Sequence, residues 1–403
     1  MNNNVKYITV VAGDYPASGH MMLVFVQQLV HALISEGVQV NVVAGQSLVH
    51  ALIHHEKLLP RFSKAETELG VTYNVYRPYT LSFGNKNPIK RLTKWYNRFV
   101  IESCLKNVGG DILYVHFWEN ALPVYEYALA CKKPMFVACG EGDNALEDMV
   151  KTMPQKDLLR LASACSGVIS VSSENKRKCI EFKLAKENDI GVFPNCVNTE
   201  IFHKIDTGKL KKELGINEDD FVISFVGGFI PRKGPDRIAQ AVTKLNDPKI
   251  KVIFIGKPFE GYEYNFDCPG IIYKGPLDHE LIPQYVNCSD VFVMPTQKEG
   301  CCNAIVEALA MGIPVISSNR PFNDDILDDK NSIRVDPDNV EAISDAIRIL
   351  RDDKALRQAM EKYSLSRHSI YTIQGRACKI LKFINEQISK INYVKQEKSN
   401  CVD

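Results

Sequence analysis

The chain lacks any long hydrophobic run. No stretch approaches about 18 uninterrupted apolar residues, the shortest length that reads as a membrane-spanning helix. The first apolar run, at residues 7–11, is too short and too early for a signal peptide, and no cleavage site follows it. These absences predict a cytoplasmic protein without a transmembrane helix.

The chain also lacks an excess of charge of either sign. It has 49 Lys and Arg against 48 Asp and Glu, so no overall field favours nucleic acid as a partner. Hydrophobic residues make up 45% and charged residues 24%, the profile of a soluble globular protein. With 403 residues, the chain is long enough for two ordinary domains, each with its own core.

Cysteine pairs with metal-ligand spacing are missing as well. None of the 12 cysteines falls in a Cys-x-x-Cys pair, and only Cys301 and Cys302 are adjacent. Most lie in apolar surroundings, as Cys131 and Cys139 do after alanines, where a free thiol packs as a small apolar group. We therefore expect reduced thiols and no zinc site.

What the chain does have is a regular alternation of strand-like and helix-like segments, which predicts parallel sheets with helices on both faces. Strands are expected at residues 7–11, 38–43, 71–75, 112–115, 135–138, 168–171 and 190–193, and again at 221–226, 252–255, 271–273, 291–294, 315–317 and 333–335. The polar segment 198–220 is expected to connect the two halves, and residues 371–394 are helical in pattern.

The most informative segment follows the expected strand at 291–294. A loop carries Glu299, and a helix that starts near Asn303 carries Glu307, eight positions after the first glutamate. Gly312 stands where a left-handed helix cap would fall. Because the loop lies at the carboxyl end of a strand, where open α/β sheets bind ligands, both carboxylates are expected to face one crevice.

Each glutamate suits a different part of a ligand. Glu299 precedes backbone N–H groups that can receive a ligand's oxygens, those of Gly300, Cys301 and Cys302. Glu307 can accept two hydrogen bonds from a vicinal diol such as a ribose. Taken alone, two glutamates are more often ordinary surface charges, and the surrounding pattern decides between the two interpretations.

That pattern resembles the retaining nucleotide-sugar glycosyltransferases of family 4. The residues that match the family's motif are Glu299, Gly300, Glu307, Ala308, Gly312, Pro314 and Val315. The resemblance implies the GT-B fold, two Rossmann-like doubly wound α/β domains facing each other across a cleft. It implies an acceptor domain at 1–197, a nucleotide-sugar domain at 198–375, and a helix and tail at 376–403 that cross back to the first domain.

The resemblance also implies roles on the donor. Glu307 would hold the ribose, while Glu299 and the amides from Gly300 to Asn303 would hold hydroxyls of the transferred sugar. Backbone contacts near Leu277 would recognise the base. Gly19, in the loop after the first strand, matches a family glycine that lets the donor phosphate approach the backbone.

The diphosphate end of the donor is expected after the strand at 221–226. Gly227 and Gly228 allow close backbone approach, and Arg232 and Lys233 place cations where the leaving group gains negative charge. The resemblance implies phosphate contact for Lys233. The family commonly has arginine at the position of Gly228, and we expect Arg232 to supply that charge instead. With these cations present, no metal ion or other cofactor is expected.

In the first half, His116 ends an expected strand, and the resemblance implies a role for it beside the sugar and diphosphate. The family more often has histidine at the position of Cys139, and we expect the nearby Glu141 to orient the acceptor. The resemblance implies that the anomeric configuration of the transferred sugar is retained. No carboxylate is assigned as a covalent nucleophile, and substitution on the same face of the sugar, assisted by the leaving phosphate, is the expected route.

Residues 86–99 combine basic and aromatic side chains with no acidic one. This segment is either an amphipathic surface helix packed on the first domain or an interfacial element that attracts anionic lipids. The second interpretation would suit a peripheral enzyme that acts on a lipid-linked glycan at the inner face of the membrane.

The sequence thus predicts a glycosyltransferase that moves a sugar from a nucleotide sugar to a glycan or lipid-linked acceptor. The alternative is a catalytically silent relative that serves as a binding or regulatory subunit. The changes at Gly228 and Cys139 favour that alternative, whereas the intact Glu299, Glu307 and Lys233 argue against it. A nicotinamide dehydrogenase is a weak rival, because the glycines here do not follow Gly-x-Gly-x-x-Gly.

Overall fold

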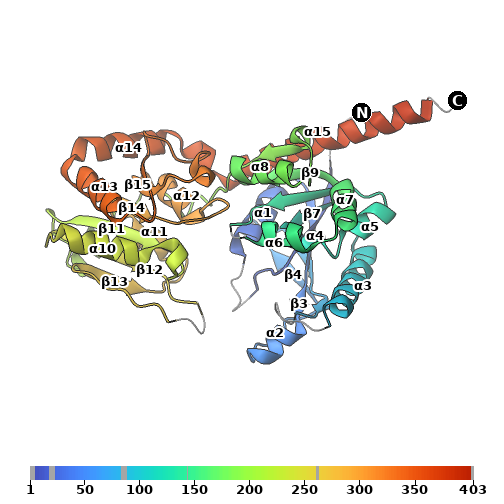
Figure 1. Ribbon diagram of the computed structural model, residues 1–403, viewed down its shortest axis with the longest axis horizontal. Coiled ribbons are helices and arrows are strands. Elements are labelled where there is room, and N and C mark those ends of the chain that lie inside the picture. The colour runs from blue at the N-terminus through green and yellow to red at the C-terminus, as the bar shows by residue number, and fades with distance from the viewer. Residues whose placement is uncertain (1–4, 18–22, 83–88, 143, 260–262, 401–403) are drawn as a thin grey trace. The chain divides into compact units, whose positions relative to one another are not determined.

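The computed structural model describes residues 5–17, 23–82, 89–142, 144–259 and 263–400. The chain forms two compact units (Figure 1). One comprises Met1–Phe193 with Gln374–Asp403, and the other comprises Pro194–Ile373. We call them the N-terminal and the C-terminal unit. Segment 198–220 was predicted as the connection between the halves, but it lies wholly in the C-terminal unit and contains the helix α9 (Gly208–Glu213).

The N-terminal unit is built on one sheet of eight strands in the order β10-β9-β8-β7-β1-β2-β5-β4. The strands are β1 (Tyr7–Ala12), β2 (Gln39–Ala44), β4 (Phe62–Glu66), β5 (Thr72–Tyr76), β7 (Ile112–His116), β8 (Met135–Cys139), β9 (Cys165–Ser170) and β10 (Ile190–Val192). All neighbours are parallel except β4, which runs antiparallel to β5 at the edge. The prediction missed β4 because its alternate residues are exposed and it has little apolar content.

The unit also contains helices and one short two-stranded ribbon. The helices are α1 (Val24–Ser35), α2 (Leu48–Ile53), α3 (Lys90–Val108), α4 (Trp118–Ala121), α5 (Tyr125–Ala130), α6 (Ala145–Thr152), α7 (Gln155–Ala164), α8 (Ser173–Glu181) and α15 (Ile373–Asn400). The ribbon pairs β3 (Gln46–Ser47) with β6 (Tyr79–Thr80).

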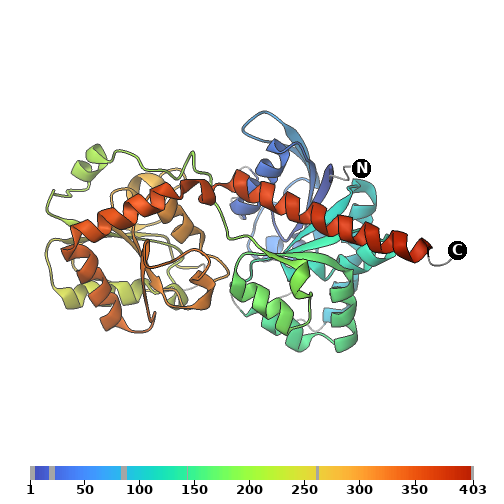
Figure 2. The ribbon, with the colours of Figure 1, turned by 90° about the horizontal axis from the view of Figure 1, so that it is seen from above.

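The C-terminal helix α15 runs along the N-terminal unit (Figure 2). The Phe383 ring packs 6.5 Å from that of Phe136 and 5.5 Å from that of Phe193, measured between ring centroids. The Asn385 side chain accepts a hydrogen bond of 2.9 Å from the backbone of Val5. These contacts fix the returning helix to the sheet of the N-terminal unit.

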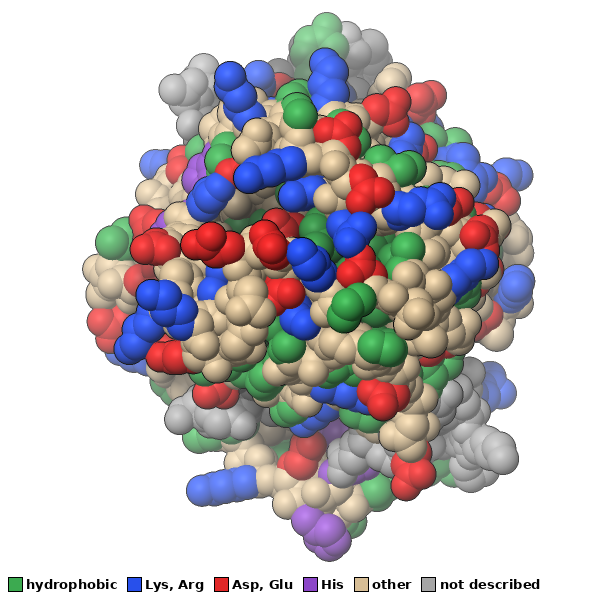
Figure 3. Space-filling model, turned by 90° about the vertical axis from the view of Figure 1, so that its left-hand side faces the viewer, with side chains coloured by type: hydrophobic (Ala, Val, Ile, Leu, Met, Phe, Trp, Pro, Cys, Tyr) green, Lys and Arg blue, Asp and Glu red, His purple; other side chains and the backbone are tan. Residues whose placement is uncertain are grey.

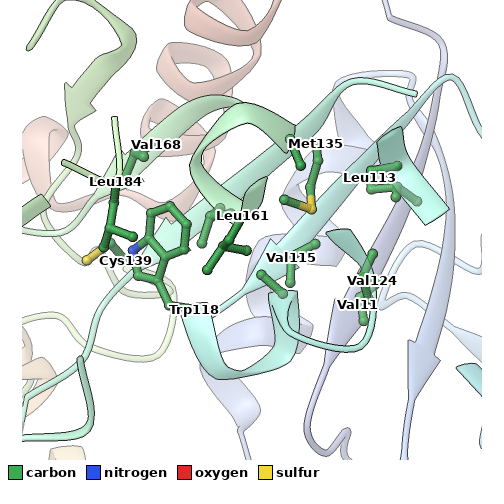
Figure 4. Packing of buried hydrophobic residues seen from close by; sticks show 14 of the residues in the cluster. Val11, Leu113, Val115, Trp118, Val124, Met135, Cys139, Leu161, Val168 and Leu184 are labelled. Atoms are coloured by element: carbon green, nitrogen blue, oxygen red, sulfur yellow. The ribbon is translucent and has the colours of Figure 1, made fainter. Parts of the chain in front are cut away.

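In one hydrophobic core cluster of this unit, Trp118 packs near Cys139, Leu161 and Leu184 (Figure 4). The Trp118 side chain is fully buried. Truncating a buried tryptophan to alanine costs about 3–5 kcal/mol, so the first turn after β7 is anchored firmly.

The C-terminal unit is a second parallel sheet, with strands in the order β13-β12-β11-β14-β15-β16. The strands are β11 (Phe221–Val226), β12 (Ile250–Ile255), β13 (Ile271–Gly275), β14 (Val291–Met294), β15 (Val315–Ser318) and β16 (Ser332–Val335), and the other helices are α10 (Pro235–Leu245), α11 (Ile282–Val286), α12 (Asn303–Ala310), α13 (Val340–Asp352) and α14 (Lys354–Ser366). From β11 the chain first forms β12 and β13 on one side, and then β14, β15 and β16 on the other side. The order therefore reverses between β11 and β14, which is where doubly wound sheets bind ligands.

The predicted α/β architecture of two doubly wound units is confirmed. The predicted left-handed residue after α12 is also confirmed, since Gly312 has φ +79°. In the face that Figure 3 shows, acidic and basic side chains are interspersed, as the near balance of charge leads one to expect. Among the helices of the described residues, none combines the length and the apolar character needed to cross a membrane.

Candidate functional site

Two loops meet at the switch point of the C-terminal unit. The first follows β11 and carries Arg232 and Lys233 in a short 3-10 turn, and the second follows β14 and carries Glu299. The strands pair directly at Ile223 and Val291, so their carboxyl ends are adjacent. The backbone N–H of Gln297 donates to the carbonyl of Arg232 at 2.9 Å, which ties the loops together.

Arg237, which sequence analysis missed, holds both loops in place. Its guanidinium donates to the carbonyl of Pro231 at 2.8 Å and to that of Pro295 at 2.8 Å. Gly234, with φ +74°, passes so close that an added Cβ would lie 2.5 Å from Nη2 of Arg237. A signal was present in the sequence, since Arg237 interrupts the otherwise apolar face of α10 that carries Ile238, Ala241 and Val242.

Glu299 lies between two cations. Its Oε1 is 2.8 Å from Nη1 of Arg232 and 3.2 Å from Nζ of Lys233. The same oxygen accepts a hydrogen bond of 3.1 Å from the hydroxyl of Thr296. The Glu299 side chain is 12% exposed and the Lys233 side chain 17%. Two positive charges thus face one carboxylate, and the pair of loops keeps a net positive charge.

The protonation of Lys233 follows from these neighbours. Burial lowers the pKa of its ammonium, but the negative charges of Cys302 and Glu299 raise it by more, and the net pKa lies above the ordinary value. Burial raises the pKa of the Cys302 thiol itself to about 11, so this thiol is neutral at pH 7. At neutral pH the negative partner of Lys233 is therefore Glu299, whose Oε1 lies 3.2 Å from its ammonium.

Glu307 lies on α12, close enough to Lys233 for their charges to interact. Burial raises the pKa of Glu307 to about 7, and the positive charge of Lys233 offsets part of this rise. At neutral pH the carboxyl group is then divided between its protonated and ionised forms. A carboxyl held in this state at a ligand-binding edge marks a candidate functional group.

The other predicted donor residues lie around the same edge. Gly227 follows β11, and a Cβ there would lie 3.0 Å from Cδ of Lys233, so the absence of a side chain leaves room for the lysine. Gly228 lies next to Gly227 at the end of that strand, and Gly300 precedes Cys301 before α12. Leu277 follows β13 and is half-buried.

Asn303, predicted to bind the donor, already has a protein partner. Its Oδ1 accepts a hydrogen bond of 2.8 Å from the amide of Asn195, which also donates to the carbonyl of Cys301 at 3.1 Å. The Cys301 and Cys302 side chains are buried. Asn195 was not predicted as a site residue, and it fixes the start of α12 from the first residues of the C-terminal unit.

In the N-terminal unit, His116 ends β7 and is buried between aromatic rings, with centroids 5.3 Å from Phe25 and 4.4 Å from Phe117. Burial and, to a smaller extent, the positive charge of Arg376 together lower the pKa of His116 to about 3, so the imidazole is neutral. Among the described residues, its Nδ1 has no hydrogen-bond partner. Its role beside the donor stays a prediction.

Glu141 has a structural contact. Its Oε1 accepts a hydrogen bond of 2.7 Å from the backbone N–H of Trp118, at the start of α4, and burial raises the pKa of its carboxyl. This contact does not support the predicted acceptor role, which stays untested. Gly19, predicted to approach the donor phosphate, lies outside the described residues.

Residues 86–88 of the basic segment also lie outside the described residues, and the rest begins α3. Leu92, Trp95 and Phe99 are 58%, 62% and 59% exposed. The rings of Trp95 and Phe99 are stacked, with centroids 5.9 Å apart and an interplanar angle of 11°. The helix packs on its unit through other residues, Ile101 and Leu105 among them. The predicted alternative of a surface helix packed on the first domain agrees with these contacts, although the aromatic side is not the packed one. Contact with anionic lipid stays a prediction.

In the part of the chain that the structure describes, no three His, Cys, Asp or Glu side chains gather as a metal site would require. The expectation of a metal-independent donor site is not tested by this and stays a prediction. What the geometry offers is an anion site with fixed cations beside a carboxyl group.

Comparison with known proteins agrees with this arrangement. Residues 206–367 match the family "Glycosyl transferases group 1". The chain is 28% identical over 207 residues to a UDP-Gal:α-D-GlcNAc-diphosphoundecaprenol α-1,3-galactosyltransferase of Escherichia coli, covering 48% of this chain and 54% of that protein. It is 28% identical over 218 residues to the capsular polysaccharide biosynthesis glycosyltransferase CapM of Staphylococcus aureus, covering 50% and 56%. The chain thus spans about half the length of these curated relatives.

Among solved structures, a sucrose-phosphate synthase from Thermosynechococcus elongatus superimposes with a TM-score of 0.75 at 16% identity, covering 96% of this chain and all of that chain (100%). Anabaena HepE in complex with UDP and glucose gives 0.65 at 14% identity, covering 95% and 100%. The C-terminal unit therefore contains the segment that matches the glycosyl transferases group 1 model, and the chain has the two-domain GT-B-like fold.

Proposed function

We propose that the chain is a retaining glycosyltransferase of family 4 type that moves a sugar from a nucleotide sugar to a glycan or lipid-linked acceptor. One observation carries the proposal: Arg232, Lys233 and Glu299 converge at the switch point, with Glu307 beside Lys233. The family match over residues 206–367 and the glycosyltransferase names of the relatives support it.

In this proposal the C-terminal unit binds the donor. Glu307 accepts hydrogen bonds from the ribose hydroxyls, and Lys233 and Arg232 contact the diphosphate. Negative charge grows on the diphosphate as the glycosidic bond breaks, so fixed cations stabilise the transition state more than the bound donor. No metal ion is needed for this step, because the cations come from the chain itself.

Glu299 has two functions in this scheme. Without donor, it holds Arg232 and Lys233 in place through its two ion pairs. When a diphosphate takes over the cations, its carboxylate becomes free to accept hydrogen bonds from hydroxyls of the transferred sugar. Glu299→Gln should therefore slow transfer, without accumulation of a glycosyl-enzyme. A covalent adduct trapped in this variant would overturn the same-face mechanism that we propose.

We propose in addition that the enzyme acts in the cytoplasm, as a peripheral protein at the inner face of the membrane. The exposed aromatic pair Trp95 and Phe99, with the basic residues Arg91, Lys94 and Arg98 on the same helix, supports contact with anionic lipid. A basic residue near such a surface contributes about 1 kcal/mol. Vesicle sedimentation tests this, and equal binding to neutral and anionic vesicles would contradict it.

The direct test of donor use is hydrolysis of nucleotide sugars by the purified protein, with water in place of the acceptor. We expect release of nucleoside diphosphate from at least one UDP- or GDP-sugar, lost in Glu307→Ala. The matched control is Glu213→Ala, an exposed glutamate of the same unit. Donor binding without any turnover, with or without acceptor, would instead indicate a silent binding subunit.

A further inference from the structure

The N-terminal unit contains a cavity of about 240 Å³ that the residues assigned so far do not line. It lies at the carboxyl ends of β1, β2 and β5, where Gly13, Gly45 and Arg77 follow the strands directly and Asp14 comes next after Gly13. Its remaining charged lining comes from Glu56 and Lys57, just after α2. In an α/β sheet this is the edge at which ligands bind.

Arg77 is the unusual member of this lining. It is only 4% exposed, and its guanidinium donates to the hydroxyl of Ser63 at 2.7 Å and to the carbonyl of Pro16 at 3.4 Å. In the described part of the chain, its Nε has no hydrogen-bond partner. Burial lowers the pKa of its guanidinium and the charge of Asp14 offsets part of this. An arginine side chain keeps its proton in proteins. Because Arg77 lines the cavity and its charge is largely removed from water, an anion in the cavity would offset the cost of burying it.

The same edge of the unit carries the two helices with the most exposed apolar side chains. Ser47 lines the cavity and caps α2, on which Leu52 and Ile53 are 78% and 65% exposed. The ribbon of β3 and β6 runs on to Leu81, whose backbone exchanges hydrogen bonds of 2.7 and 2.8 Å with Asn97 of α3. Figure 1 shows α2, β3 and α3 at one end of the unit. A polar cavity therefore adjoins side chains suited to a lipid surface.

We propose that this cavity binds the phosphorylated sugar head of the acceptor. Arg77 and Lys57 would hold the phosphate, while Asp14 and Glu56 would accept hydrogen bonds from sugar hydroxyls. The volume is below the range of about 300–1,000 Å³ typical of pockets for drug-sized ligands, so it fits one sugar ring with its phosphate. This inference depends on the proposed function, because only a transferase needs an acceptor site.

The proposal moves the acceptor away from Glu141, whose carboxylate caps α4, to a site with a buried cation. Two kinds of molecule carry the phosphorylated sugar that this site would recognise. The head can be presented on a lipid chain, which the exposed residues of α2 and α3 would hold at a membrane, or as a free sugar phosphate. The common feature is a phosphate monoester or diester on a hexose.

Calorimetric titration of the whole protein with α-D-glucose 1-phosphate tests the binding. Titration to about 10 mM detects dissociation constants in the millimolar range. We expect saturable binding that is at least about 10-fold weaker in Arg77→Gln, from the loss of charge-assisted hydrogen bonds, and a few-fold weaker in Lys57→Gln. Glucose alone and inorganic phosphate alone should each bind more weakly than the whole head. Arg177→Gln on α8, an exposed arginine of the same unit, is the control.

Several outcomes overturn the proposal. No saturable binding by the wild-type chain is one, and equal binding by wild type, Arg77→Gln and Lys57→Gln is another. Since Arg77 is buried, thermal unfolding of its variant is compared with wild type. Lys57 is exposed, so Lys57→Gln keeps the test valid if Arg77→Gln does not fold.

Two further arms complete the experiment. Presenting the same head on a polyprenyl chain in neutral vesicles distinguishes a lipid-held acceptor, which should bind better than the free head, from a soluble one. Binding of UDP and GDP is measured in parallel. Nucleotide binding that Glu307→Ala removes, with no sugar-phosphate binding, would leave the proposed function intact and refute only this site. If the wild-type protein binds neither nucleotide nor sugar phosphate, the proposed function and the acceptor site are both refuted.

Discussion

Replacing Glu307 by glutamine should stabilise the free protein and at the same time weaken its binding of nucleotide. The folded chain raises the pKa of this carboxyl from 4.5 to about 7. A group whose pKa is raised on folding binds its proton more tightly in the folded state, so stability falls as pH rises from about 4.5 to about 7. Each pKa unit corresponds to about 1.36 kcal/mol, and the shift therefore destabilises the folded chain by at most about 3 kcal/mol at pH 8.

Glu307→Gln removes this penalty because a neutral amide replaces the carboxylate. For a unit of this size, 1 kcal/mol moves Tm by about 2–4 °C, so we expect Tm at pH 8 to rise by up to about 10 °C. At pH 5 the folded wild type is protonated, and the two proteins should unfold at similar temperatures. Differential scanning fluorimetry from pH 5 to pH 8 measures this, with Glu213→Gln as control.

Nucleotide affinity should change in the opposite direction to stability. The ionised carboxylate accepts two hydrogen bonds from a ribose, so wild-type affinity for UDP or GDP should rise through about pH 7, and Glu307→Gln should bind weakly at every pH. The difference between wild type and variant isolates Glu307 from the titration of the nucleotide. Equal or lower stability of Glu307→Gln at pH 8, compared with wild type, would refute the reasoning that this carboxyl is desolvated near Lys233.

Three other changes test the loops and the exposed helix. Lys233→Ala should lower the turnover number by a factor of about 10²–10³, because it removes one group that stabilises transition-state charge. Arg232→Ala should lower it less. An unchanged rate in Arg232→Ala would show that this residue does not replace the missing arginine at 228. Gly234→Ala should destabilise the chain by about 1–3 kcal/mol in chemical unfolding, since it adds a Cβ at φ +74° against Arg237; wild-type stability would contradict the geometry. Trp95→Ala should reduce sedimentation with anionic vesicles but leave nucleotide binding unchanged; undiminished sedimentation would remove α3 from the membrane interface.

The fold could be predicted largely because its parallel strands are buried on both faces. Strands such as Val291–Met294 and Phe221–Val226 are continuous apolar runs, and the structure places them at the predicted residues. The edge strand β4 was missed because it is exposed and alternating. The segment 198–220 was assigned to the wrong place because polar composition indicates only exposure, and exposed segments occur within a domain as well as between domains.

The site could be predicted in part. Glu299, Lys233 and Arg232 were identified from the loops that carry them, and the structure brings them within hydrogen-bond distance. Arg237 was missed because its place on the apolar face of α10 indicates burial but not its partners, which are backbone carbonyls of the preceding loop and of a loop far along the chain. The exposure of Trp95 could not be predicted either, because an amphipathic pattern does not say which side of a helix faces the protein.

The central claim is that Lys233 and its neighbours bind an activated sugar. The most direct measurement is the release of nucleoside diphosphate from a panel of UDP- and GDP-sugars by wild type, Lys233→Ala and Glu213→Ala. The account predicts release from at least one donor, retained in Glu213→Ala and reduced at least about 100-fold in Lys233→Ala. Release from that donor by Lys233→Ala at the wild-type rate would contradict it.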